Sequence, residues 1–67
     1  MEDYDITLLS LLATGISQHQ ISDELRKMNV SPHSVSSVEK RLNRLKNILG
    51  AANNVQLVLI AKDLGLI

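Results

Sequence analysis

Lysine and arginine are unevenly distributed along this chain. Residues 26–46 hold six of them against one acidic residue, whereas residues 1–25 hold five acidic residues and no basic one. Residues 47–67 are balanced, so the formal net charge of zero hides a segregation of charge. Segregation of this kind indicates one face suited to an anionic partner such as nucleic acid. The alternative is that Lys40, Arg41 and Arg44 form an ordinary solvated helix face.

A helix-start signal lies ahead of the basic segment. Ser17 followed by Gln20 matches the Ser-x-x-Gln capping box, in which each side chain accepts a hydrogen bond from the other residue's backbone N–H. Ile16 and Ile21 are spaced as the hydrophobic staple that often accompanies such a box. We therefore predict a helix over residues 18–28.

A second start signal follows shortly afterwards. Ser31 can cap a helix, and Pro32 suits its first position because a proline lacks the N–H that would be unpaired there. This predicts a turn over residues 29–31 and a helix over residues 32–49. Apolar residues recur in that helix at spacings of three and four, at Val35, Val38, Leu42, Leu45 and Leu49. Two helices joined by a short turn, the second basic on one side, have the sequence form of a helix-turn-helix.

Each glycine of the chain follows an apolar periodic segment, at Gly15, Gly50 and Gly65. Glycine is common just beyond the end of a helix, because it accepts a left-handed backbone conformation at little cost. We therefore predict two further helices, over about residues 5–14 and 54–64. With no strand pattern, the chain is expected to be an all-α, four-helix domain that spans residues 1–67.

The two outer helices have their own start signals. Asp3 or Asp5 can cap the first, where a carboxylate also complements the helix dipole. Asn53 and Gln56 form a pair similar to a capping box at the fourth.

The helix over residues 54–64 carries more apolar residues than one core-facing stripe requires. A helix that is apolar most of the way round is normally buried on several sides, which so small a domain can hardly provide. We therefore predict a two-fold homodimer through Val55, Val58 and Leu59. The alternative is that Val58 is an ordinary exposed apolar residue.

Several other functional classes are disfavoured. The chain has no cysteine, and His19 and His33 are 14 residues apart without a neighbouring ligand motif, so no metal is expected. No Gly-x-Ser-x-Gly sequence or glycine-rich phosphate loop is present, so neither an enzyme nor a cofactor or small-molecule ligand is expected. The longest apolar run, residues 57–61, is far shorter than the roughly 20 residues of a membrane-spanning helix. Without a signal-peptide pattern, we predict a cytoplasmic protein.

The segment from Leu11 to Ile67 resembles the LuxR-type helix-turn-helix domain of bacterial response regulators and quorum-sensing regulators, which also occurs alone. The matching pieces are Leu-Leu-Ala-Thr-Gly-Ile-Ser (11–17), Gln-Ile-Ser (20–22), Ser-Pro-His-Ser-Val (31–35), Leu-Gly-Ala (49–51) and Ile-Ala-Lys-Asp-Leu-Gly-Leu-Ile (60–67). The resemblance implies that the third helix enters the major groove of double-stranded DNA and that the fourth forms a dimer.

The resemblance also implies which residues contact DNA. Its base-reading positions fall on Ser36, Ser37 and Lys40. A lysine can donate to guanine O6 or N7, whereas a serine pairs with several base edges and discriminates poorly. Its phosphate-contacting positions fall on Gln18, His19, Ser34, Arg41 and Arg44.

Two functions follow as hypotheses. The first is a dimeric, sequence-specific DNA-binding transcriptional regulator, which the basic segment favours. The second is a protein-interaction module that sequesters or modulates another regulator through the helix over residues 54–64. The zero net charge, the acidic first third of the chain and the weakly discriminating Ser36 and Ser37 favour the second hypothesis.

Overall fold

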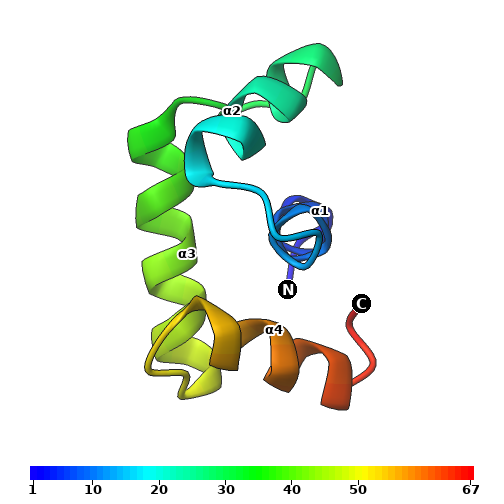
Figure 1. Cartoon of the computed structure of the whole chain (residues 1–67), viewed down its shortest axis with the longest axis vertical. Coiled ribbons are helices and arrows are strands. Elements are labelled where there is room, and N and C mark those ends of the chain that lie inside the picture. The colour runs from blue at the N-terminus through cyan, green and yellow to red at the C-terminus, as the bar shows by residue number, and fades with distance from the viewer.

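A computed structural model describes all 67 residues, Met1–Ile67. It contains four helices and no strand, which confirms the predicted all-α class (Figure 1). The helices are α1 (Asp3–Leu12), α2 (Gln18–Lys27), α3 (Val35–Leu49) and α4 (Asn54–Asp63). None of them has the length and apolarity that crossing a membrane requires.

The start of α1 differs from the prediction. The helix begins two residues earlier than expected, with Glu2 at the N-cap, so Asp3 and Asp5 lie in the first turn. The backbone N–H of Glu2 donates to Asp5 Oδ2 at 3.1 Å. The prediction that Asp3 or Asp5 is the cap was therefore wrong. Asp5 instead occupies the third helical position, from which its carboxylate reaches back to the cap.

The start of α2 is the one predicted. The backbone N–H of Gln20 donates to Ser17 Oγ at 3.2 Å, and the backbone N–H of Ser17 donates to Gln20 Oε1 at 2.8 Å. Both halves of the capping box are thus present, and α2 begins at Gln18. Its end at Lys27 lies one residue before the predicted end.

The start of α3 was predicted wrongly. Its N-cap is Ser34, whose Oγ accepts from the backbone N–H of Ser37 at 3.2 Å, so Ser31 and Pro32 lie outside the helix. Two long-range hydrogen bonds hold the chain before Ser34. The Tyr4 hydroxyl donates to the Pro32 carbonyl at 2.7 Å. The hydroxyl of the buried Ser22 donates to the carbonyl of His33, the residue after Pro32.

The start of α4 is close to the prediction. Asn53 is the N-cap, and its Oδ1 accepts from the backbone N–H of Gln56 at 2.8 Å. The Gln56 side chain reaches one residue further back than a capping box requires and accepts from the backbone N–H of Ala52. The turn before α4 begins at Gly50, which ends α3 with a left-handed backbone at φ 71°.

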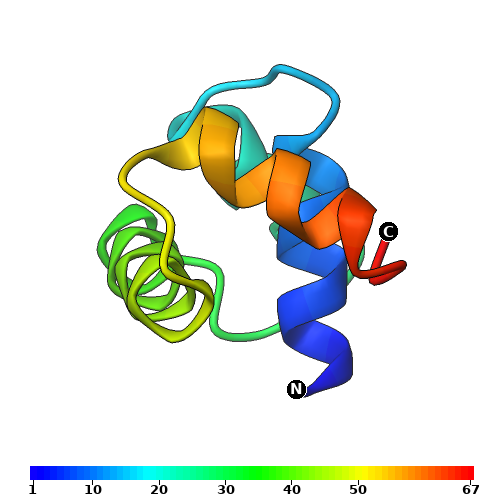
Figure 2. The same cartoon turned by 90° about the horizontal axis from the view of Figure 1, so that it is seen from below.

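One apolar core joins all four helices. In Figure 1, α3 runs along one side, α2 and α4 cross it near its two ends, and α1 occupies the space between them. Figure 2 looks along α3 and shows α1 from its side, next to α4. Because α3 packs against the other three helices, only its opposite face is left for a partner. The buried apolar residues are Leu8, Leu9, Ile21, Leu25, Val38, Leu42, Leu45, Leu57 and Ala61.

Candidate nucleic-acid interface

The outer face of α3, as we name it here, is a continuous polar stripe opposite the core. Val38, Leu42 and Leu45 fix the buried face. With 3.6 residues per turn, the positions that point the other way are four, three and four residues apart, beginning at Ser36. These positions are Ser36, Lys40, Asn43 and Asn47, and Arg44, one turn after Lys40, borders the same stripe. We include it in the outer face, and all five side chains are exposed: Ser36, Lys40, Asn43, Arg44 and Asn47.

Two members of this face were absent from the predicted site. Asn43 and Asn47 are neither charged nor part of the motif that carried the resemblance, so sequence reasoning passed over them. Extending the helical spacing from Ser36 and Lys40 along the whole of α3 finds both. An asparagine can pair with adenine N6 and N7 through two hydrogen bonds, so the Asn43 side chain has the chemistry to read a base.

The ion pairs explain how a chain with zero net charge keeps a basic surface. Arg26 pairs with Asp23 at 3.7 Å, and Lys27 pairs with Glu24 at 3.5 Å, both within α2. A third basic residue, Arg41, pairs with two acidic residues of α1. The cations without an ion-pair partner are Lys40, Arg44, Lys46 and Lys62. Three of these four belong to α3, so the unneutralised positive charge is concentrated on that helix.

The structure brings some of the predicted contact residues together. Ser36, Lys40 and Arg44 lie along the outer face of α3, and their side chains are exposed and without hydrogen-bond partners. Ser34 and Ser37 instead bond to each other, since the Ser34 hydroxyl donates to Ser37 Oγ at 2.8 Å. These two serines build the start of α3.

The predicted contacts Gln18 and His19 lie on a different element. They occupy the first turn of α2, the helix that packs against α3. His19 is exposed and Gln18 is half-buried. The first backbone N–H groups of a helix carry partial positive charge, so this turn suits a phosphate oxygen. The two side chains are therefore available, but their use stays a prediction.

Arg41 is turned away from the outer face and toward α1. Its Nη1 lies 2.6 Å from Asp5 Oδ1 and 3.4 Å from Glu2 Oε2, and its guanidinium lies over the Tyr4 ring, 4.9 Å from the centroid. The hydrogen bond to Asp5 raises the pKa of the Arg41 guanidinium, and burial raises the pKa of the Tyr4 hydroxyl. We name these four residues, Glu2, Tyr4, Asp5 and Arg41, the α1–α3 clamp.

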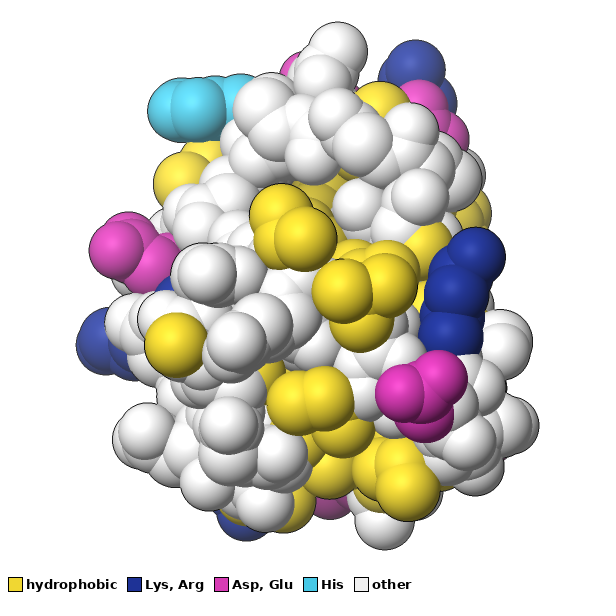
Figure 3. All heavy atoms as spheres, turned by 60° about the horizontal axis from the view of Figure 1, so that its bottom comes forward, with side chains coloured by type: hydrophobic (Ala, Val, Ile, Leu, Met, Phe, Trp, Pro, Cys, Tyr) yellow, Lys and Arg dark blue, Asp and Glu magenta, His cyan; other side chains and the backbone are white.

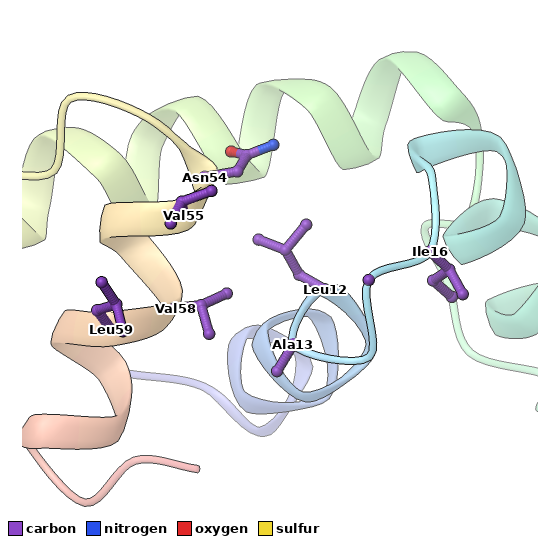
Figure 4. A pocket seen from close by; sticks show the side chains of 8 residues that line it. Leu12, Ala13, Ile16, Asn54, Val55, Val58 and Leu59 are labelled. Atoms are coloured by element: carbon purple, nitrogen blue, oxygen red, sulfur yellow. The ribbon is translucent and has the colours of Figure 1, made fainter.

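A second notable surface is apolar and belongs to α4. Val55 is 70% exposed and Leu59 is 57% exposed, whereas Val58 is half-buried. Together with the end of α1 they border a groove of about 340 Å³. Figure 4 shows Val58 directed toward Leu12 across this groove, and Figure 3 shows hydrophobic side chains gathered on the same side of the molecule.

Comparisons of the chain with known protein families, with characterised proteins and with solved structures found no match. The function is therefore inferred from the two surfaces just described, the outer face of α3 and the apolar groove beside α4. No group of three or more His, Asp or Glu side chains is placed to hold a metal ion.

Proposed function

We propose that the chain is a sequence-specific DNA-binding transcriptional regulator of the LuxR type, which acts as a homodimer in the bacterial cytoplasm. One observation carries the proposal. Lys40 and Arg44 are exposed, have no ion-pair partner and lie on the one face of α3 that packs against no other helix. A helix that presents such a face fits the major groove of B-DNA, which is about 12 Å wide.

The side chains of the outer face divide into two roles. Ser36, Lys40 and Asn43 face the base edges, where Lys40 donates to guanine and Asn43 pairs with adenine. Arg44 contacts a phosphate, with Gln18 and His19 of α2 on the same strand or its neighbour, and these contacts fix the position of the protein without reading sequence. Ser34 and Ser37 contribute indirectly, because their mutual hydrogen bonds set where α3 begins.

The apolar surface of α4 supports the homodimer. Val55 and Leu59 would gain burial on pairing, and Val58 would contact the partner from the wall of the groove. A two-fold axis beside α4 places two copies of α3 in successive segments of the major groove. Half-sites of such dimers are about 10 bp apart from centre to centre.

Selection of bound sequences from random duplex DNA tests the proposal. We expect enrichment of an inverted repeat with half-sites about one helical turn apart. A variant carrying Lys40→Glu and Arg44→Glu should enrich nothing. Lys62→Glu is the matched control, since Lys62 is also exposed and unpaired but lies on α4. Absence of any enriched sequence from the unmodified protein would contradict the proposal.

A second candidate function is the protein-interaction module, which the exposed apolar groove favours. In that case α4 binds another regulator and α3 has no nucleic-acid partner. The selection experiment separates the two, because an interaction module retains no duplex at low salt. An interaction module of this kind would lose its complex with the other regulator in Leu59→Ala.

A further inference from the structure

The α1–α3 clamp distinguishes Arg41 from the neighbouring basic residues of α3. The Asp5 side chain is 8% exposed and the Arg41 side chain 22% exposed. Lys40 and Arg44, in contrast, are exposed and unpaired. The resemblance to the LuxR-type domain had placed Arg41 with Arg44 among the phosphate contacts and Lys40 among the base-reading positions.

The clamp also reaches the connection that precedes α3. The Tyr4 ring stacks on the Arg41 guanidinium, and the Tyr4 hydroxyl donates to the Pro32 carbonyl two residues before the N-cap Ser34. The first turn of α1 therefore contacts α3 near its middle and the chain just ahead of its start. Two such contacts restrain rotation of α3 about its own axis.

We infer that Arg41 is a positioning residue, which binds Asp5 in the free protein and in the DNA complex alike and thereby sets the direction of the outer face. The inference rests on the proposed DNA-binding function. If Arg41 acts in this way, the specificity of binding depends on the first turn of α1, although no residue of that turn contacts DNA.

The burial of Asp5 is the reason Arg41 stays in place. Moving the guanidinium to a phosphate would leave a nearly buried carboxylate without its cation, which is strongly unfavourable. Asp5 also accepts from the backbone N–H of Glu2, so its position is fixed from two sides. A charge already neutralised within the protein releases no counterion from DNA, and Arg41 should add nothing to the salt dependence of binding.

The first test compares two neutral replacements of similar length, Arg41→Met and Arg44→Met. Affinity for a mixed-sequence duplex is measured over a series of salt concentrations. The slope of log affinity against log salt is negative. We expect Arg44→Met to make it less negative by about 0.9 and Arg41→Met to leave it unchanged. If Arg41→Met fails to fold, the double variant Asp5→Leu with Arg41→Met replaces the ion pair by an apolar one and serves instead. An equal loss of slope from Arg41 and Arg44 would overturn the inference.

The second test concerns positioning and uses Asp5. Asp5→Asn keeps the shape of the side chain but removes its charge, so it should lower the ratio of specific to mixed-sequence affinity by about 2- to 30-fold. The salt slope should not change, and Asp5→Glu, which restores a carboxylate, should recover the ratio. A rise in both affinity and slope for Asp5→Asn would mean that Arg41 had been released to a phosphate, which would overturn the inference.

A third measurement separates failure of the clamp from failure of the proposed function. In a nuclear magnetic resonance spectrum, the Arg41 Nη1–H signal should exchange with water more slowly than the corresponding signal of Arg44, because Nη1 donates to Asp5 Oδ1, and Asp5→Asn should abolish the difference. If the protein binds no duplex but this signal is protected, the proposed DNA-binding function is wrong. The α1–α3 clamp is then a structural contact only, and the inference that Arg41 positions the outer face for DNA is overturned. If Arg41 and Arg44 exchange alike, the clamp is absent in solution.

Discussion

Replacing Leu59 by alanine tests the dimer surface. Leu59 is 57% exposed, so folding has removed less than half of the residue from water. Complete burial of a leucine is worth about 1.5–3 kcal/mol, and covering the exposed part is thus worth roughly 0.9–1.7 kcal/mol. A two-fold interface contains the residue twice. Since alanine keeps its Cβ, we expect the dimer dissociation constant to rise by roughly 10- to 200-fold.

The same change should hardly affect folding of the subunit. An exposed position contributes little to the core, so the free energy of unfolding should change by no more than about 0.5 kcal/mol. Sedimentation equilibrium gives the dissociation constant, and urea denaturation of the isolated subunit gives the stability. The matched control is Ile48→Ala, because Ile48 is 60% exposed but belongs to α3.

Two results would refute this reasoning. If Ile48→Ala weakens the dimer as much as Leu59→Ala does, the loss of any exposed apolar side chain has the same effect, and α4 is not the interface. If the unmodified protein stays monomeric both in solution and on a duplex with two half-sites, the apolar surface of α4 has another role.

Three further predictions concern other parts of the molecule. Lys40→Ala should lower specific affinity by about 1–3 kcal/mol more than mixed-sequence affinity, whereas Arg44→Ala should weaken both equally, as fluorescence anisotropy with the two duplexes can measure. Val58→Glu places a charge on the half-buried wall of the groove and should abolish cooperative binding to two half-sites while circular dichroism still shows a helical protein. Gly50→Ala should cost about 1–2 kcal/mol in urea denaturation without altering DNA affinity, because the backbone is left-handed there and an added Cβ meets no atom within 4 Å.

Local signals predicted the parts of the fold that depend on neighbouring residues. The capping box at Ser17 and the cap at Asn53 each involve partners three residues away, and both helices begin where these pairs place them. The Ser-Pro pair predicted that Ser31 caps α3, whereas the cap is Ser34. Bonds from Tyr4 and from the buried Ser22 hold the residues between them outside the helix, and such distant partners leave no local signal.

The candidate site shows the same limit. Lys40 and Arg44 could be predicted because the helical period fixes which face they share. Arg41 has the same charge and lies in the same run, yet its partner Asp5 is 36 residues away. Only the packing of α1 against α3 reveals that its charge is already neutralised.

The salt dependence of binding to duplex DNA tests the central claim, that the outer face of α3 binds DNA and places the unpaired cations of this helix against it. The unpaired cations of this helix are Lys40, Arg44 and the half-buried Lys46. Two or three cations bound against the DNA per subunit, whether at a phosphate or in the groove, displace as many counterions and predict a slope of log affinity against log salt of about −2 to −3, which Arg44→Gln should make less negative by about 0.9. A slope near zero, or no binding at low salt, would contradict the claim.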